Sequence, residues 1–138
     1  MKTIILTAST GHGHVSAANS ICELLKSHQL DCEVVDALSF LGKDVSKLIS
    51  KTLVNIAVKT PGIFGFMYKS GDALSSEDRK SPVYYANSLY ADKLRQHIIN
   101  KGYDTAVCTH LFPAEALTYL RHKKEFCFDS LGNGKTVD

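Results

Sequence analysis

Two glycines and two histidines alternate near the start of the chain, in the order Gly11, His12, Gly13, His14. A glycine loop that leads into a helix exposes unpaired backbone N–H groups beside the positive end of the helix dipole, which suits a phosphate or a developing negative charge. A neutral imidazole near pH 7 suits general-base catalysis on a hydroxyl group. The pattern predicts an anion-binding loop with a candidate base. A purely structural turn with solvent-exposed histidines would have the same composition.

Other sites can be built from the same loop. Two histidines separated by one residue can bind a metal ion, but no acidic or cysteine residue follows nearby, so we expect no metal. Gly11 and Gly13 match the first two glycines of the dinucleotide-binding pattern G-x-G-x-x-G, and Asp36 lies at about the distance of a ribose-binding acid. Ser16 occupies the place of the third glycine. A standalone nucleotide- or dinucleotide-binding module without transferase activity is therefore the alternative function.

Expected strands and expected helices alternate along the chain, as in an α/β fold. Residues 3–8 are β-branched or apolar and uncharged, as expected of a strand buried on both faces. A strand, a tight glycine loop, a helix and a strand open a parallel βαβ unit. We expect strands at 3–8, 32–36 and 104–109, and helices at 15–27, 43–59, 82–102 and 114–123. This order predicts an open parallel sheet with flanking helices.

Two expected loops share one edge of that sheet. Ligands bind beyond the carboxyl ends of the strands in open α/β sheets. Residues 9–14 follow the first strand, and residues 110–113 follow the third. We therefore expect these loops to form the binding edge.

Length and composition limit the function classes. The chain has 138 residues and 44% hydrophobic residues, which is typical of one globular domain. A net charge of +2 does not indicate a nucleic-acid partner, and we expect none. Four cysteines without metal-binding spacing indicate reduced thiols in a cytosolic protein.

Residues 6–18, LTASTGHGHVSAA, resemble the N-terminal domain of the monogalactosyldiacylglycerol synthase family, which includes plant galactolipid synthases and bacterial processive diacylglycerol glucosyltransferases. The shared pattern is a strand, then T-G-x-G-H, then a helix that begins with small residues. Further agreement comes from Asp36, which ends the second strand, and from the His110–Pro113 segment after a later strand. The resemblance covers residues 1–122.

The resemblance implies a Rossmann-like N-terminal half of a two-domain, B-type glycosyltransferase fold. That half holds the lipid acceptor, and the other half holds most of the UDP-sugar, which is a co-substrate; no cofactor is implied. The implied reaction moves a hexose from a UDP-sugar to diacylglycerol with inversion. By the same likeness, His14 is the base and Gly11 and Gly13 shape the loop. The expected substrate-binding residues are Gly11, Gly13, Phe64, Tyr68, His110 and Pro113, of which Phe64 and Tyr68 are expected to contact the acceptor or the membrane.

Residues 43–59 combine an aliphatic stripe with a lysine face and are followed by aromatic side chains. Such a segment can lie in a membrane interface, or it can be an ordinary core helix with a solvated face. Because diacylglycerol stays in the bilayer, the resemblance favours contact with an anionic lipid surface and a cytoplasmic location, peripheral to the inner face of the membrane. The expected membrane contacts are Lys43, Lys47, Lys51 and Phe66.

The resemblance also sets an expected domain division. Residues 1–124 correspond to the Rossmann-like domain, and residues 125–138 read as an irregular tail. We expect the family's C-terminal donor domain to be absent and the chain to be a truncated fragment that is inactive by itself.

Overall fold

The structure is a computed structural model, and it describes residues 1–42, 44, 45, 47, 51, 59, 82–123, 127, 128, 134 and 135. Its central element is a three-stranded parallel sheet in the order β2-β1-β3. The strands are β1 (Lys2–Thr7), β2 (Asp31–Asp36) and β3 (Thr105–Cys108). β1 pairs with β2 on one side and with β3 on the other, so the strand expected to be buried is the central one.

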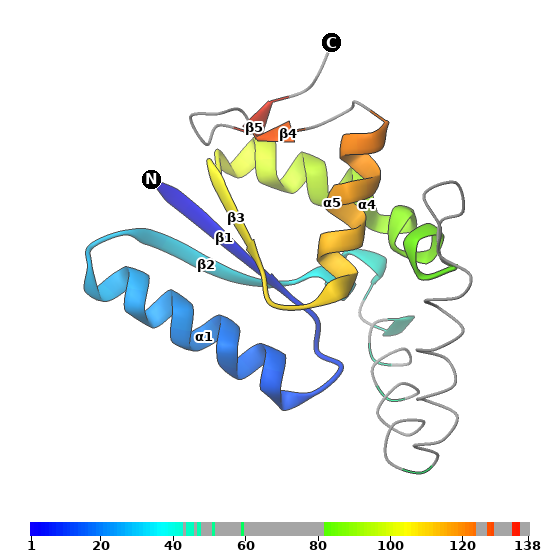
Figure 1. Cartoon of the computed structure of the whole chain (residues 1–138), viewed down its shortest axis with the longest axis horizontal. Helices are drawn as coiled ribbons and strands as arrows, with labels where there is room; N and C mark the ends of the chain where they lie inside the picture. Colours follow the sequence, from blue (N-terminus) through cyan, green and yellow to red (C-terminus); the bar gives the residue numbers. More distant parts are fainter. Residues whose placement is uncertain are drawn as a thin grey trace.

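Helices cover both faces of this sheet. α1 (His12–Ser27) lies on one face, while α4 (Pro82–Lys101) and α5 (Leu111–His122) lie on the other (Figure 1). Successive side chains of β1 point to opposite faces. Ile4 and Leu6 pack in the cluster that includes α4 and α5, whereas Ile5 packs with residues of α1. The expected α/β fold, a Rossmann-like open parallel sheet, is confirmed, and it is consistent with the N-terminal half of a glycosyltransferase.

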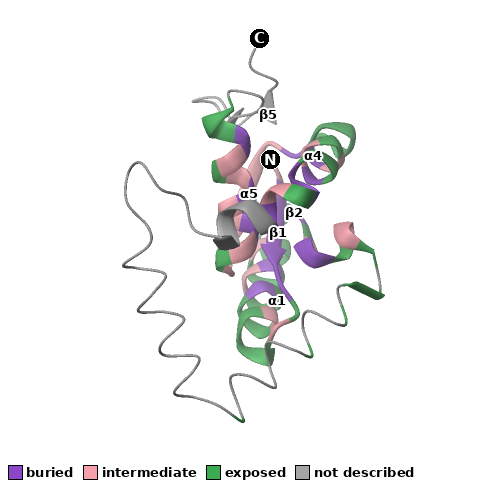
Figure 2. Cartoon of the chain, turned by 90° about the vertical axis from the view of Figure 1, so that its right-hand side faces the viewer, coloured by how far each residue is buried: buried purple, intermediate pink, exposed green. Residues whose placement is uncertain are grey.

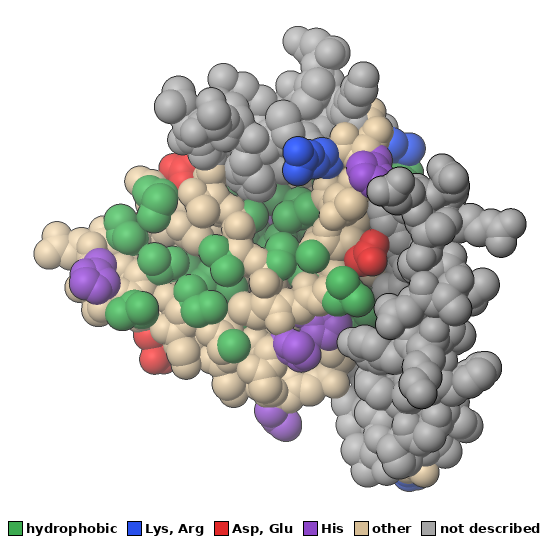
Figure 3. Space-filling view, in the orientation of Figure 1, with side chains coloured by type: hydrophobic (Ala, Val, Ile, Leu, Met, Phe, Trp, Pro, Cys, Tyr) green, Lys and Arg blue, Asp and Glu red, His purple; other side chains and the backbone are tan. Residues whose placement is uncertain are grey.

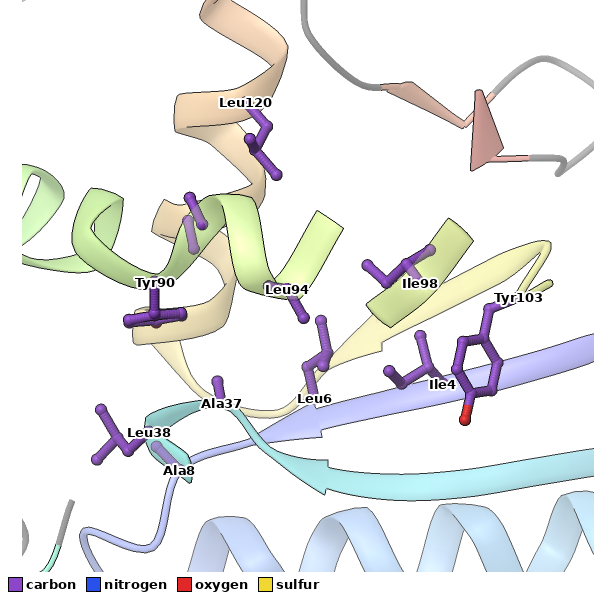
Figure 4. Close-up of a cluster of buried hydrophobic side chains, with 12 residues drawn as sticks. Ile4, Leu6, Ala8, Ala37, Leu38, Tyr90, Leu94, Ile98, Tyr103 and Leu120 are labelled. Carbon is purple, nitrogen blue, oxygen red and sulfur yellow. The ribbon is translucent and has the colours of Figure 1, made fainter. Parts of the chain in front are cut away.

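The larger core cluster lies between the sheet and α4 (Figure 4). Tyr90, Leu94 and Ile98 follow one another at four-residue spacing, which places them on one stripe of the helix. Leu89 precedes Tyr90 in the sequence and is 75% exposed, because one residue along a helix turns the side chain away by about 100°. Asn87 is buried in the stripe instead and accepts a hydrogen bond from the Tyr90 hydroxyl at 2.8 Å.

The first helix begins earlier than expected. α1 starts at His12, not at residue 15, and Gly11 is its N-cap residue with extended backbone angles. The glycine loop is therefore shorter, and both His12 and His14 lie in the first helical turn. The N–H groups of the first turn have no acceptors within the helix, so residues that are common in loops, such as glycine, can occupy this turn.

The last described helix also begins earlier. α5 starts at Leu111, so most of the expected loop 110–113 is helical. His110 caps the helix: its side chain accepts a hydrogen bond from the Phe112 N–H. Pro113 is compatible with the first turn because its missing N–H would have no intrahelical partner there.

Short elements complete the described chain. A 3₁₀ helix, η1 (Ala37–Leu41), follows β2. In the segment expected to be irregular, β4 (Cys127–Phe128) pairs antiparallel with β5 (Gly134–Lys135). Burial is greatest along β1, and the helices turn exposed faces outward (Figure 2).

Candidate functional site

Polar side chains meet at the carboxyl edge of the sheet. The three strands are parallel, so their carboxyl ends lie at one edge. Ser9 and Thr10 follow β1, Asp36 ends β2, and Thr109 and His110 follow β3. The start of α1 reaches the same place (Figure 1).

The N-terminus of α1 is open. Its N-cap residue, Gly11, has no side-chain cap, and no acidic residue lies in the first turn. Apart from its chain neighbours and the backbone of its own helix, a Cβ built on Gly11 or Gly13 would meet none of the described residues within 4 Å. Packing against this part of the chain therefore does not require glycine at either position, and a ligand could approach the backbone closely there. The uncapped N–H groups favour a negatively charged ligand group.

His14 presents an exposed imidazole at this edge. Its Nδ1 donates a hydrogen bond to the Thr109 backbone oxygen at 2.7 Å. A carbonyl oxygen only accepts, so Nδ1 carries the hydrogen and Nε2 of the neutral ring carries a lone pair. The Thr109 hydroxyl in turn donates to the His14 backbone oxygen at 3.1 Å. The ring is thus oriented by the chain, and its Nε2 can accept a proton.

His110 lies against His14 with the opposite arrangement of its nitrogens. The ring centroids are 4.5 Å apart in an edge-to-face contact. His110 Nδ1 accepts from the Phe112 N–H at 3.1 Å, and His110 Nε2 lies 2.8 Å from Thr10 Oγ1. Burial, and secondarily the proximity of His14, lower the pKa of His110 to about 4. His110 is therefore neutral at pH 7.

Asp36 is held by its own chain. One carboxylate oxygen accepts from the Ser9 hydroxyl at 2.5 Å, and the other accepts from the Leu38 N–H at 3.0 Å. In the dinucleotide hypothesis, this carboxylate would bind a ribose. Its two oxygens instead join the loop after β1 to η1.

Figure 3 shows histidine side chains at the surface where the strand ends meet the start of α1, with separate hydrophobic side chains on the same face of the molecule.

The sequence matches the family described as monogalactosyldiacylglycerol (MGDG) synthase over residues 14–127. The chain belongs to the MGDG synthase family. No curated protein and no solved structure matches it. Family membership places the chain among the glycosyltransferases of glycolipid biosynthesis.

The matched span begins at His14 and includes the rest of α1, β2, α4, β3 and α5. β1 and the glycine loop precede it. The contact between His14 and Thr109 therefore joins two parts of the region that the MGDG synthase family shares.

The structure brings together four residues that the sequence analysis assigned to the site. They are Gly11, Gly13, His14 and His110. Pro113 is fully buried in the first turn of α5, where its side chain packs in the interior instead of facing solvent.

Two of the expected acceptor contacts of the MGDG synthase family, Phe64 and Tyr68, lie outside the described residues, as do Lys43 and Phe66. Lys47 and Lys51 are described, and both are exposed. None of the helices formed by the described residues is both long and apolar enough to cross a bilayer.

Sequence reasoning missed three hydroxyl-bearing residues of the site: Ser9, Thr10 and Thr109. Ser9 and Thr10 lie within three residues of the end of β1, and Thr109 directly follows β3, so all three lie at the binding edge. Their place in the order of elements was a signal that could have identified them. Within the part of the chain that the structure describes, no three His, Cys, Asp or Glu side chains gather as metal ligands.

Proposed function

We propose that this chain is the acceptor-binding half of a glycosyltransferase that moves a hexose from a UDP-sugar to diacylglycerol with inversion. The observation that carries the proposal is the exposed His14 ring, whose Nδ1–H is held by the Thr109 carbonyl. This bond leaves the Nε2 lone pair for a substrate. Membership of the MGDG synthase family supports glycosyl transfer as the reaction.

His14 acts as the general base. Its Nε2 accepts the proton of the diacylglycerol hydroxyl as that oxygen forms a bond to the anomeric carbon. The bond from this carbon to the UDP oxygen breaks on the opposite face, which inverts the centre and releases UDP. The proton remains on Nε2, and the Thr109 carbonyl stabilises the resulting imidazolium through the Nδ1–H bond.

The open start of α1 acts on the leaving group. Negative charge develops on the diphosphate as its bond to the sugar breaks. The uncapped N–H groups after Gly11 and the helix dipole favour that charge. The absence of a Cβ at Gly11 and Gly13 allows the diphosphate to approach the backbone.

The acceptor lipid sets the location of the reaction. Diacylglycerol remains in the bilayer, so the chain must reach the membrane surface, for which we propose the inner face. The exposed lysines Lys47 and Lys51 support attraction to anionic headgroups. By the family resemblance, a second Rossmann-like unit holds most of the UDP-sugar, so we propose that this chain alone binds the acceptor but does not turn over.

The test is binding of 1,2-dioctanoylglycerol, a short-chain diacylglycerol, to the ¹⁵N-labelled full chain. We expect chemical-shift changes at His14, Thr109 and His110, and weaker binding by the His14→Asn variant. Its amide can replace the Nδ1–H donor but offers no basic nitrogen.

His28→Asn is the matched control because His28 is an exposed histidine at the other end of α1. It should bind like the wild type. Indifference of the wild type to 1,2-dioctanoylglycerol, together with a thermal shift on adding NAD⁺, would favour the dinucleotide-binding module. Sugar transfer by the purified chain would contradict the proposal that this chain alone binds the acceptor without turnover.

A further inference from the structure

The two histidines of the site determine the direction of a chain of hydrogen bonds. The Phe112 N–H can only donate, so the His110 Nδ1 that it contacts at 3.1 Å must accept. A neutral imidazole with an accepting Nδ1 carries its hydrogen on Nε2. His110 therefore donates from Nε2 to Thr10 Oγ1, over the 2.8 Å that separates them.

This bond leaves the Thr10 hydroxyl with a hydrogen to donate elsewhere. A threonine hydroxyl has one hydrogen and can accept through its lone pairs. Because His110 donates to Oγ1, the Thr10 O–H cannot point back at that ring. Among the described residues, the structure records no acceptor for it. Thr10 is half-buried, and His110 holds its hydroxyl in place.

The same edge therefore offers one acceptor and one donor. The acceptor is His14 Nε2, because Nδ1 is bound to Thr109. The donor is the Thr10 O–H. Both side chains are in contact with the His110 ring, which lies between them in the network. A ligand group that pairs with both must donate a hydrogen to His14 Nε2 and accept one from the Thr10 O–H. An alcohol can do both. A phosphate oxygen only accepts and would find a lone pair at His14.

We propose that Thr10 is a binding residue for the reacting hydroxyl of the acceptor: its O–H donates to the substrate oxygen whose own hydrogen is donated to His14 Nε2. The inference rests on the proposed function and adds a residue and an orientation to it. It also gives His110 a positioning role, because His110 fixes the donor direction of Thr10 without touching the substrate.

The polarity of the network can be measured without any ligand. Long-range ¹H–¹⁵N spectra distinguish the two neutral histidine tautomers. We expect His110 to be protonated on Nε2 and His14 on Nδ1. A His110 ring protonated on Nδ1 would overturn the proposal, because Thr10 would then donate to His110 and have no hydrogen left for a substrate.

Ligand binding tests whether the Thr10 hydroxyl contacts the acceptor. Thr10→Val keeps the side-chain shape and removes the hydroxyl, whereas Thr10→Ser keeps the hydroxyl. For 1,2-dioctanoylglycerol, we expect Thr10→Val to raise Kd roughly five- to tenfold, the effect of one hydrogen bond, and Thr10→Ser to restore binding. The effect should vanish with 1,2-dioctanoyloxypropane, which lacks the hydroxyl group. UDP binding should not change.

Each remaining outcome has a distinct meaning. Equal binding of 1,2-dioctanoylglycerol by wild type and Thr10→Val would overturn the role of Thr10 and leave the proposed function intact. Weaker UDP binding by Thr10→Val, with unchanged lipid binding, would assign the donor to phosphate and also overturn it. Failure of the wild type to bind 1,2-dioctanoylglycerol would overturn the proposed function and this inference together.

Discussion

His14 and Thr109 are joined by two hydrogen bonds that run in opposite directions. The His14 ring donates from Nδ1 to the Thr109 carbonyl at 2.7 Å, and the Thr109 hydroxyl donates to the His14 carbonyl at 3.1 Å. Thr109 itself is fixed to β1, because its N–H donates to the Leu6 carbonyl at 3.0 Å. The start of α1, the end of β3 and the end of β1 are thereby held together where the candidate base is exposed.

Removing the Thr109 hydroxyl should weaken the fold without changing the state of the His14 ring. Thr109→Val loses the bond to the His14 carbonyl but keeps the backbone carbonyl that holds Nδ1. We expect the free energy of unfolding to fall by about 1 kcal/mol, measured by urea denaturation. Thr118→Val is the control, because it loses only a local bond to Ala114 on the exposed side of α5. A change in the His14 tautomer would show that the hydroxyl, and not the carbonyl, orients the ring.

Replacing Gly13 by alanine should separate stability from binding. Outside its own helix, a Cβ at Gly13 meets none of the described residues within 4 Å, and alanine is the better helix former, so Gly13→Ala should raise the free energy of unfolding by up to about 1 kcal/mol. UDP binding should weaken, because the new methyl group occupies the space through which the diphosphate approaches the backbone. Thermal unfolding and titration with 1,2-dioctanoylglycerol and UDP measure the two effects.

Gly102→Ala is the matched control. Gly102 has a φ of +67°, so alanine there should destabilise the fold by about 1 kcal/mol and leave binding unchanged. If Gly13→Ala binds both ligands as tightly as the wild type, the open backbone of α1 is not a ligand contact.

Stability should fall as the pH falls through the range set by His110. Burial lowers its pKa from 6.5 to about 4 in the folded state, so between these values the unfolded chain binds a proton that the folded chain does not. The contribution of the neutral His110 ring to the free energy of unfolding is complete above pH 6.5 and is lost as the pH approaches 4. Because the ring is half-exposed, we expect a loss of only about 1–2 kcal/mol, measured by urea denaturation across this range.

His110→Asn provides the comparison for this pH dependence. Asparagine is a good N-cap residue, so it can accept from the Phe112 N–H, but it does not titrate. Its free energy of unfolding should change less with pH than that of the wild type. An identical pH dependence in the two proteins would mean that other groups are responsible.

Charge reversal at the exposed lysines tests membrane attachment. Lys47→Glu and Lys51→Glu should each weaken co-sedimentation with vesicles of phosphatidylglycerol and diacylglycerol, since one lysine near an anionic surface contributes about 1 kcal/mol. Added salt should weaken wild-type binding. Lys26→Glu makes the same change in net charge at an exposed position on α1. Equal losses in all three variants would indicate a general charge effect and no membrane-binding segment.

Two thiols should be unreactive in the folded protein. Burial raises the pKa of Cys32 to about 12 and that of Cys108 to about 11, so very little thiolate is present near neutral pH. We expect alkylation of both by iodoacetamide to be at least about tenfold slower in the native chain than in urea, followed by peptide mass spectrometry. Similar rates in the two conditions would contradict the buried placement of Cys32 and the partly buried placement of Cys108.

Local sequence patterns predicted most of the described fold. The uncharged run at residues 3–8 contains most of the central strand β1, and α4 (Pro82–Lys101) matches the helix expected at 82–102 to within one residue. The predicted first residues of α1 and α5 were wrong, because a glycine N-cap and a histidine N-cap are weak local signals. Their capping depends on backbone geometry that periodicity does not report.

The sequence by itself determined which residue types could do chemistry and that they would follow the strands of a parallel sheet, because periodicity and glycine placement act over a few neighbouring residues. Only the tertiary structure decided which groups the two histidines contact and which ring nitrogen of each carries the hydrogen. His14 and Thr109 are 95 positions apart, and Thr10 and His110 are 100 apart, so no local pattern contains either pair. Strand pairing brings them within hydrogen-bonding distance, and those bonds assign the proton positions on both rings.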